Sequence, residues 1–515
     1  MAFSILIKNG TILDGAGGEP YVADLGISAN RIEKIGNLAG ETADQIIDAT
    51  NLYVTPGFID ITNHSDVYGT LFSLPMQESF LWQGVTTILL GNCGESLAPV
   101  SKRESLTELE RWTTGFSVPI NWNSLAEYYD NIENLGVGLN VATLVGQETL
   151  KRNAKTLEER IFLLEGAMKE GAWGMSSNFS FAERSSAADD EIIALLKVVK
   201  KYGGLYKIHL KDEGKNFLPS ISAAVFLARA SEARTVISHL KAIGRDAWKD
   251  FENALKIFKK AQSDGVDITF DIFPYLRTGS ALVSFLPSWA KIGANKEILK
   301  MISDKEISKK TINELKSATL HADRILIASA FKDKSLVGKT LEEISKHSGM
   351  PVEELILEIL KINELNASVF GKTLSGGNLL RAVAEQGGMI SSDGAGYDVD
   401  FKHFGDLVHP RSFGAFPRFF SVISGKAKIS LAEAVVKMTS LPAKALGLKD
   451  RGILKPKNIA DIAIFHPEEF KDQATYGNPY RYASGLRALI ISGNLAISGG
   501  KLAIKRHGLV LRKKN

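Results

Sequence analysis

The sequence holds one cysteine, Cys93, and it lies where a metal-binding or reactive thiol would be useful. An apolar and β-branched run precedes it, and the cysteine stands between Gly91 and Gly94, where a chain turns and exposes side chains. Two histidines follow later apolar runs in the same way, His209 in YKIHLK and His239 in VISHLK. A thiolate and two imidazoles suit Zn²⁺, and a fourth position left to water is typical of catalytic zinc sites.

Each of these residues also has a purely structural interpretation. A lone cysteine is often a small buried hydrophobic residue, and a histidine at a strand end is often held by hydrogen bonds alone. Their joint placement favours a metal site because a structural account needs separate coincidences, so we predict that Cys93, His209 and His239 hold zinc. Asp393, in the run MISSDG, follows another apolar run and would act as general base and acid for a zinc-activated water.

The middle of the chain alternates between two patterns that would position these residues. Short apolar runs typical of buried strands are separated by helical patterns at residues 189–202, 218–233 and 250–264. Strands that alternate with helices indicate a parallel sheet, and about eight such units favour an α/β fold of the (β/α)8, TIM-like barrel type. Active sites of such barrels lie at the carboxyl ends of the strands, where all four candidate residues are expected.

The two ends of the chain have a different pattern. Residues 1–54 have the pattern of β-hairpins, with turn residues such as Asn9-Gly10 between apolar runs, and residues 442–515 contain similar short strands. We predict a small β-sandwich domain built from both chain termini, beside a barrel over residues 55–441. The stretch at about 278–361 is rich in lysine and glutamate and fits the barrel pattern poorly, so we interpret it as an α-rich insertion.

Composition limits the classes of function. The chain has 515 residues, of which 44% are hydrophobic and 23% charged, as in a globular protein of more than one domain. Its 62 basic and 58 acidic residues give a net charge of +4 without a long basic run, which argues against nucleic-acid and membrane-surface partners. No segment approaches the ~20 apolar residues that span a bilayer, and no signal-peptide pattern opens the chain. We expect a cytoplasmic enzyme with a small-molecule substrate.

A series of motifs, taken in order, resembles the D-aminoacylases (N-acyl-D-amino acid deacylases) of the amidohydrolase superfamily. The motifs are PGFID at 56–60, GNCG at 91–94, HLKDE at 209–213, SHLK at 238–241, SDG at 392–394, HPR at 409–411, MTSLPAK at 438–444 and ADI at 460–462. A single motif such as SDG is weak evidence, but the ordered set spans nearly the whole chain. The GNCG element separates this branch from relatives that use a carbamylated lysine.

The resemblance implies roles for the matching residues. The cysteine and the two histidines of the candidate zinc site are metal ligands in this family, and the aspartate that matches Asp393 activates the attacking water and then protonates the leaving amine. Arg411 and Lys241 match the residues that hold the substrate carboxylate. The terminal β segments match a small sandwich domain beside the barrel.

The sequence departs from the family pattern at the metal centre and in the pocket. The first strand of the family typically ends in His-x-His, and Thr62 stands at the first of these positions, which leaves His64 to join Asp393 in a weaker second metal site. Because a neutral hydroxyl is a poor zinc ligand compared with imidazole, we expect one tightly bound Zn²⁺ per chain. Phe181 and Phe273 replace tyrosines of the family, and we predict that both bind substrate in a more apolar pocket.

Three functions compete on this evidence. The first is zinc-dependent hydrolysis of a linear amide, such as deacylation of an N-acyl-D-amino acid or a related small amide that bears a carboxylate. The second is an enzyme of the same fold that acts on a cyclic or modified amide or on a different bond. The third is a non-catalytic barrel that keeps zinc for stability or binding, and Asp393 argues against it because a structural zinc needs no base beside it.

Overall fold

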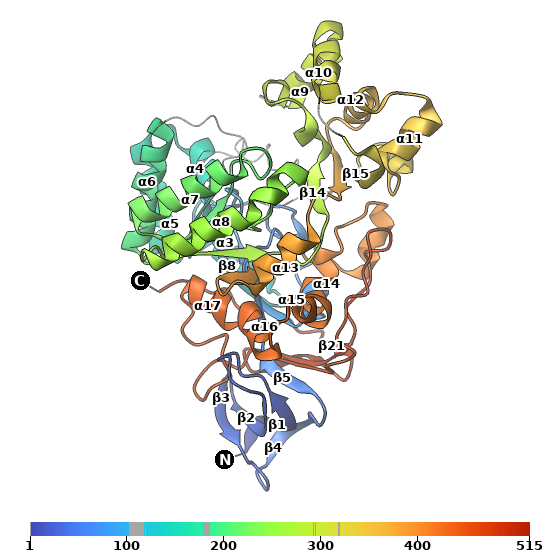
Figure 1. Ribbon diagram of the computed structural model, residues 1–515. Helices are drawn as coiled ribbons and strands as arrows, with labels where there is room; N and C mark the ends of the chain where they lie inside the picture. Colours follow the sequence, from blue (N-terminus) through green and yellow to red (C-terminus); the bar gives the residue numbers. More distant parts are fainter. Residues whose placement is uncertain are drawn as a thin grey trace.

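The computed structural model describes residues 2–101, 118, 120–178, 186–291, 293, 295–317 and 320–514. Figure 1 shows strands from both chain ends gathered at one end of the molecule, a barrel of strands and helices in the middle, and a helix-rich region of residues 278–371 at the opposite end. The N-terminus lies at the tip of the terminal strands, whereas the C-terminus lies beside the barrel.

The central region is built from parallel strands that close on one another. Three of them pair in the order β6-β7-β8 and six in the order β17-β13-β12-β11-β10-β9. Only Leu144 separates β8 from β9, and a parallel bridge between Asn63 and Gly394 joins the chain just beyond β6 and β17. The strands are β6 (Phe58–Asp60), β7 (Val85–Leu90), β8 (Asn140–Thr143), β9 (Val145–Gly146), β10 (Gly174–Asn178), β11 (Leu205–His209), β12 (Arg234–Ile237), β13 (Ile268–Ile272) and β17 (Gly388–Ile390).

Helices follow most of these strands and cover the barrel, as the alternation predicts (Figure 1). They are α1 (Thr70–Ser73), α2 (Glu78–Leu81), α3 (Leu125–Leu135), α4 (Gln147–Asn153), α5 (Leu157–Lys169), α6 (Ser186–Lys201), α7 (Phe217–Ser231), α8 (Arg245–Ser263), α13 (Gly376–Ala384), α14 (Arg411–Arg418), α15 (Ser424–Ala427), α16 (Leu431–Met438) and α17 (Ser440–Leu446).

Local sequence explains why these segments take these forms. The β7 sequence VTTILL is buried at every position, as expected for a strand covered on both faces. In α8, Phe251, Ala254, Leu255 and Phe258 are buried, and their spacing of three and four residues places them on one face of a helix. Capping boxes begin α3 and α5, because Ser124 and Thr156 each accept a hydrogen bond from the backbone three residues on.

The chain ends form one nine-stranded sheet in the order β21-β20-β19-β18-β5-β1-β2-β3, with β4 paired to β1. Both termini therefore contribute to one β region, whereas the packing of two sheets into a sandwich stays a prediction. The strands are β1 (Phe3–Ile12), β2 (Tyr21–Ser28), β3 (Arg31–Gly36), β4 (Ala43–Asp48), β5 (Tyr53–Pro56), β18 (Ile462–Phe465), β19 (Leu486–Ile491), β20 (Asn494–Ser498) and β21 (Lys501–Leu502).

The region at the opposite end has its own hydrophobic core, formed by buried residues between Leu282 and Val369. Besides the expected helices it contains an antiparallel sheet in the order β14-β16-β15, which the α-rich interpretation did not anticipate. Its elements are β14 (Thr278–Ala281), α9 (Asn295–Ser303), α10 (Lys305–Ser317), β15 (Ile325–Ala330), α11 (Leu341–Ser348), α12 (Val352–Ile362) and β16 (Ala367–Gly371). The predicted limits of this insertion and of the flanking domains stay predictions.

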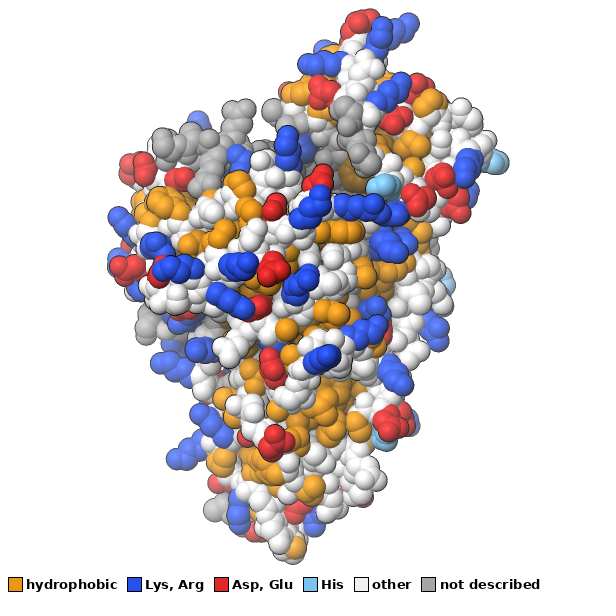
Figure 2. Space-filling model, in the orientation of Figure 1, with side chains coloured by type: hydrophobic (Ala, Val, Ile, Leu, Met, Phe, Trp, Pro, Cys, Tyr) orange, Lys and Arg blue, Asp and Glu red, His pale blue; other side chains and the backbone are white. Residues whose placement is uncertain are grey.

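The surface is mixed in charge. Figure 2 shows basic and acidic side chains interspersed over the helices of the barrel and the region above it. None of the helices described in the structure combines the length and the apolar character that crossing a bilayer requires.

Candidate active site

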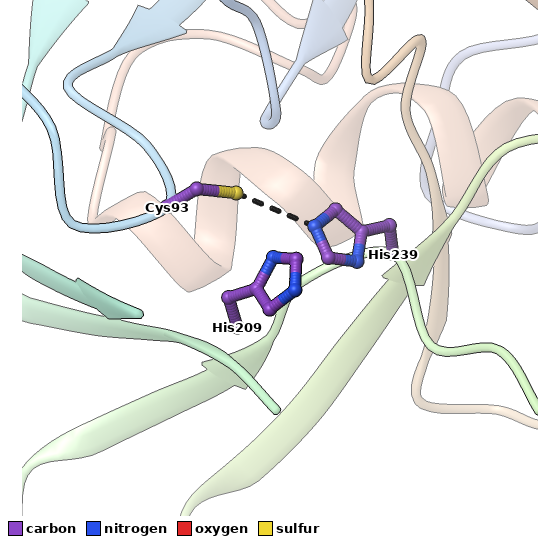
Figure 3. A group of neighbouring side chains, drawn as sticks. All are labelled: Cys93, His209 and His239. Carbon is purple, nitrogen blue, oxygen red and sulfur yellow. Dashed lines mark hydrogen bonds between the residues drawn. The ribbon is translucent and has the colours of Figure 1, made fainter. Parts of the chain in front are cut away.

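The three predicted zinc ligands come together at the carboxyl ends of three barrel strands. Cys93 follows β7, His209 ends β11 and His239 follows β12 (Figure 3). One ligand atom from each lies within 4.8 Å of the other two. Cys93 Sγ is 3.3 Å from His239 Nε2, and the two imidazole rings meet edge to face with centroids 4.5 Å apart. Residues separated by up to 146 positions thus form one cluster.

The backbone at these positions is unusual. Cys93, His239 and Asp393 have φ angles of 52°, 38° and 51°, in the left-handed region that residues with a Cβ seldom adopt. Such conformations cost on the order of 1–3 kcal/mol each and cluster at functional sites. Gly91 has a clearer steric reason, because a Cβ there would lie 2.1 Å from the carbonyl oxygen of Leu144. The strands therefore end in tight turns that aim these side chains at a common point.

Charge favours the thiolate form of Cys93. Burial raises the pKa of the thiol, but the charge of His239 and hydrogen bonds from His209, His239 and His64 outweigh burial and hold that pKa well below its usual value. A cysteine binds metal as the thiolate. The buried Nδ1 of His209 has no hydrogen-bond partner among the described residues. A depressed thiol pKa and a buried imidazole nitrogen without a hydrogen-bond partner in the described chain both fit a metal-binding site.

Asp393 lies beside this cluster, three residues beyond β17. Its Oδ1 is 3.0 Å from His64 Nε2 and its Oδ2 is 2.5 Å from Arg411 Nη1. Burial raises the pKa of the Asp393 carboxyl, but the charges of Arg411, His239 and His64 outweigh it and hold this pKa well below its usual value. His64 responds in turn: burial lowers its pKa, whereas the Asp393 and Cys93 contacts raise it, to about 10.

Arg411 begins α14 and is held from several sides. Its guanidinium carbon lies 4.8 Å from the ring centroid of Phe273, a cation–π contact. Its backbone N–H donates to His409 Nδ1 at 3.1 Å, and the other ring nitrogen of His409 lies 3.0 Å from the carbonyl oxygen of Arg277. The Nε of Arg411 is buried and has no hydrogen-bond partner within the described chain. Arg411 therefore combines a contact to Asp393 with an unused donor.

Lys241 has different surroundings from those expected of a free carboxylate-binding group. Its Nζ is 2.6 Å from Glu213 Oε1 and 2.8 Å from His239 Nδ1, and its side chain is only 10% exposed. Burial raises the pKa of Glu213, but the charges of Lys241, His209 and His239 bring it down to about 2. Glu213 Oε1 is also 3.4 Å from His239 Nδ1. This geometry supports an orienting role for Glu213 toward His239, a role the sequence did not suggest.

The predicted substrate-binding phenylalanines are placed unequally. Phe273 directly follows β13, is 1% exposed, and contacts Arg411. Phe181 lies outside the described residues. The roles predicted for both residues, and for Lys241, Arg411 and His64, stay predictions.

Comparisons with known proteins find relatives over nearly the whole chain. No family model matches the chain. The chain is 28% identical over 502 residues to the D-aminoacylase of Alcaligenes xylosoxydans xylosoxydans, and the aligned region covers 95% of this chain and 94% of that protein. A D-aminoacylase structure with a binuclear metal centre, described as showing one-metal activation and second-metal attenuation, matches with a TM-score of 0.81 and 26% identity over 99% of this chain and 100% of the other. The chain is similar to the D-aminoacylases over nearly its whole length. The predicted resemblance is thereby confirmed, and with it the amidohydrolase class.

A third comparison extends the likeness in fold. The N-acyl-D-glutamate deacylase of Bordetella bronchiseptica, solved with zinc and a phosphonate inhibitor that mimics the tetrahedral intermediate, matches with a TM-score of 0.82 and 24% identity over 99% of this chain and 100% of the other. This deacylase structure contains zinc, and the D-aminoacylase structure has a binuclear metal centre. The barrel predicted from strand alternation also agrees with the fold of these neighbours.

Two residues beneath the site were missed by the sequence reasoning. Lys207 on β11 and Asp271 on β13 are both fully buried, and their charged atoms lie 2.9 Å apart. Asp271 Oδ1 accepts the backbone N–H of His239 at 2.9 Å and so helps fix that ligand. A signal was present in the sequence: in LYKIH, residues 205, 207 and 209 share one face of the strand, so Lys207 must point inward with His209.

Proposed function

We propose that this chain is a zinc-dependent amidohydrolase that removes the acyl group from an N-acyl-D-amino acid or a closely related small amide bearing a carboxylate. The observation that carries the proposal is the meeting of Cys93, His209 and His239 within 4.8 Å, with Asp393 and Arg411 beside them. The catalytic unit would be the barrel at residues 55–441, interrupted by an insertion and flanked by the terminal β region.

The donor set suits one Zn²⁺ with a position left for water. When bound there, zinc lowers the pKa of a coordinated water to ~7 and polarises the substrate carbonyl. Asp271 accepts the backbone N–H of His239, and Lys241 and Glu213 lie 2.8 and 3.4 Å from its outer ring nitrogen. A carboxylate at that nitrogen helps to orient a metal-binding imidazole.

Asp393 would move the proton. Held by Arg411 and His64, its carboxyl has a pKa well below the usual value, so it is a carboxylate, the form that accepts a proton, at neutral pH. It would take a proton from the attacking water on one of its carboxylate oxygens and deliver it to the nitrogen of the leaving amine. The amide C–N bond breaks in that step, and the products are a free carboxylate and an amine.

Arg411 would bind the substrate carboxylate. The Nε of Arg411 is buried and makes no hydrogen bond within the described chain, so it can donate to a substrate. A carboxylate suits this role because it forms strong, charge-assisted hydrogen bonds with a guanidinium group. Lys241 is a weaker candidate in this structure because Glu213 already neutralises it at 2.6 Å. The preference for the D configuration rests on the likeness to D-aminoacylases.

The test combines metal analysis with a substrate screen. Purified protein should hold zinc and should hydrolyse members of a panel of N-acetyl-D-amino acids faster than their L counterparts. Asp393→Asn should keep its zinc and fold but lose turnover by ~10²–10⁴-fold, the usual cost of removing a general base and acid. Asp400→Asn, at an exposed aspartate seven positions on, is the matched control and should stay active. An active Asp393→Asn enzyme, or protein without metal, would refute the proposal.

A further inference from the structure

The second metal site expected from the family pattern does not fit this chain, and the residues below the zinc cluster show why. Thr62 stands where the first histidine of His-x-His would be, and its hydroxyl is engaged on both sides. It donates to Asp271 Oδ2 at 2.9 Å and accepts a hydrogen bond from Lys207 Nζ. A metal ion would have to share this oxygen with an ammonium group, and like charges repel.

The ammonium group of Lys207 is fully partnered. Its three hydrogen-bond acceptors are the carbonyl oxygen of Ile61 at 2.6 Å, Asp271 Oδ2 at 2.9 Å and the Thr62 hydroxyl. An ammonium has three N–H donors, so each has an acceptor. The side chains of Lys207 and Asp271 are both 0% exposed. A buried charge is tolerated when it is paired and hydrogen-bonded in this way.

The carboxylate of Asp271 is equally saturated. Oδ2 accepts from Lys207 and Thr62, and Oδ1 accepts from the Ser391 hydroxyl at 2.7 Å and from the His239 backbone at 2.9 Å. Asp271 lies on β13, and its partners come from β11 and the segments that follow β6, β12 and β17. The Lys207–Asp271 ion pair and its hydrogen bonds thus connect five barrel strands or the segments that follow them, next to the zinc ligand His239.

We propose that the Lys207 ammonium is a resident cation that takes over the place of the second metal ion, so that this enzyme is mononuclear by construction. The inference deepens the proposed function, on whose zinc site it rests. Thr62 and Lys207 form one unit in this account: the Thr62 hydroxyl accepts a hydrogen bond from the Lys207 ammonium and donates to Asp271, so position 62 offers no ligand to a second metal ion. His64 is then free to bind Asp393, which it contacts at 3.0 Å.

The test restores the missing ligand with and without the ammonium and counts zinc. Wild type and Thr62→His should each bind one equivalent, because Lys207 still occupies the site. Thr62→His combined with Lys207→Gln should bind a second equivalent. Its affinity for that second ion should exceed the residual affinity of Thr62→His by on the order of 100-fold, the size of effect that groups beside metal ligands exert on metal affinity. Lys437→Gln is the matched control, since that lysine is also buried but bonds carbonyl oxygens of Glu385 and Gly388 at the other end of β17.

Two equivalents in Thr62→His alone, or one equivalent in the folded double variant, would overturn the inference. If the histidine variants fail to fold, Thr62→Asp replaces Thr62→His in the same comparison, because aspartate is close to threonine in size and is a strong metal ligand. Failure of the proposed function would look different. Wild type would then lack even the first zinc, or would hold it without hydrolysing any amide. The number of zinc ions bound by the position-62 variants is measured independently of that activity.

Discussion

Replacing Arg411 by lysine should slow hydrolysis of a carboxylate-bearing substrate far more than hydrolysis of the same molecule with its carboxylate converted to a carboxamide. The Nε of Arg411 is buried without a partner in the described chain, and Nη1 is already 2.5 Å from Asp393. A hydrogen bond to a charged group contributes ~1.5–3 kcal/mol, so losing one predicts a fall of about 10- to 150-fold in kcat/KM for the carboxylate substrate.

The carboxamide separates two effects of the same variant. Lysine at position 411 also disturbs Asp393, and that disturbance slows both substrates alike, whereas a lost carboxylate contact slows only one. The assay is the ratio of kcat/KM for the two substrates in wild type and variant. Arg418→Lys is the control, because this arginine ends the same helix and pairs with Asp472 at 3.0 Å. Equal losses on both substrates would show that Arg411 acts on Asp393 alone.

Three further outcomes are expected. Cys93→Ala should lose zinc on metal analysis, because the thiolate is one of three ligands, and full retention would exclude Cys93 as a ligand. Wild type carrying one zinc should gain no rate from a second equivalent, because Lys207 occupies the place of a second ion; a steep gain would mean that two metals act. Asp461→Ala should lower the melting temperature, since it removes the more buried of the two carboxylates that pair with Arg451, at 2.9 Å, and breaking a buried pair costs up to ~3–5 kcal/mol. Asp450→Ala removes the more exposed carboxylate, at 3.2 Å, and should change the melting temperature little.

The sequence alone determined the features that depend on local pattern. Apolar periodicity gave a helix over 250–264, and the structure has α8 at Arg245–Ser263. The placement of Cys93, His209 and His239 just beyond buried runs was enough to predict that they meet, because parallel strands in a barrel present their carboxyl ends on one rim. The hydrophobic patterns of both termini likewise predicted a shared β region, which the nine-stranded sheet contains.

Only the tertiary structure decided which polar groups pair inside the barrel. Lys207 bonds Asp271, 64 positions away in the sequence, and Thr62 bonds Asp271, 209 positions away. Hydrophobic periodicity is a local pattern and cannot predict pairs at such separations. The sequence revealed that Thr62 lacks the imidazole of its relatives, but not that a buried ammonium lies against its hydroxyl. Barrel closure buries these side chains in one layer, where a charge is tolerated only when it is paired, and that requirement appears only once the strands are assembled.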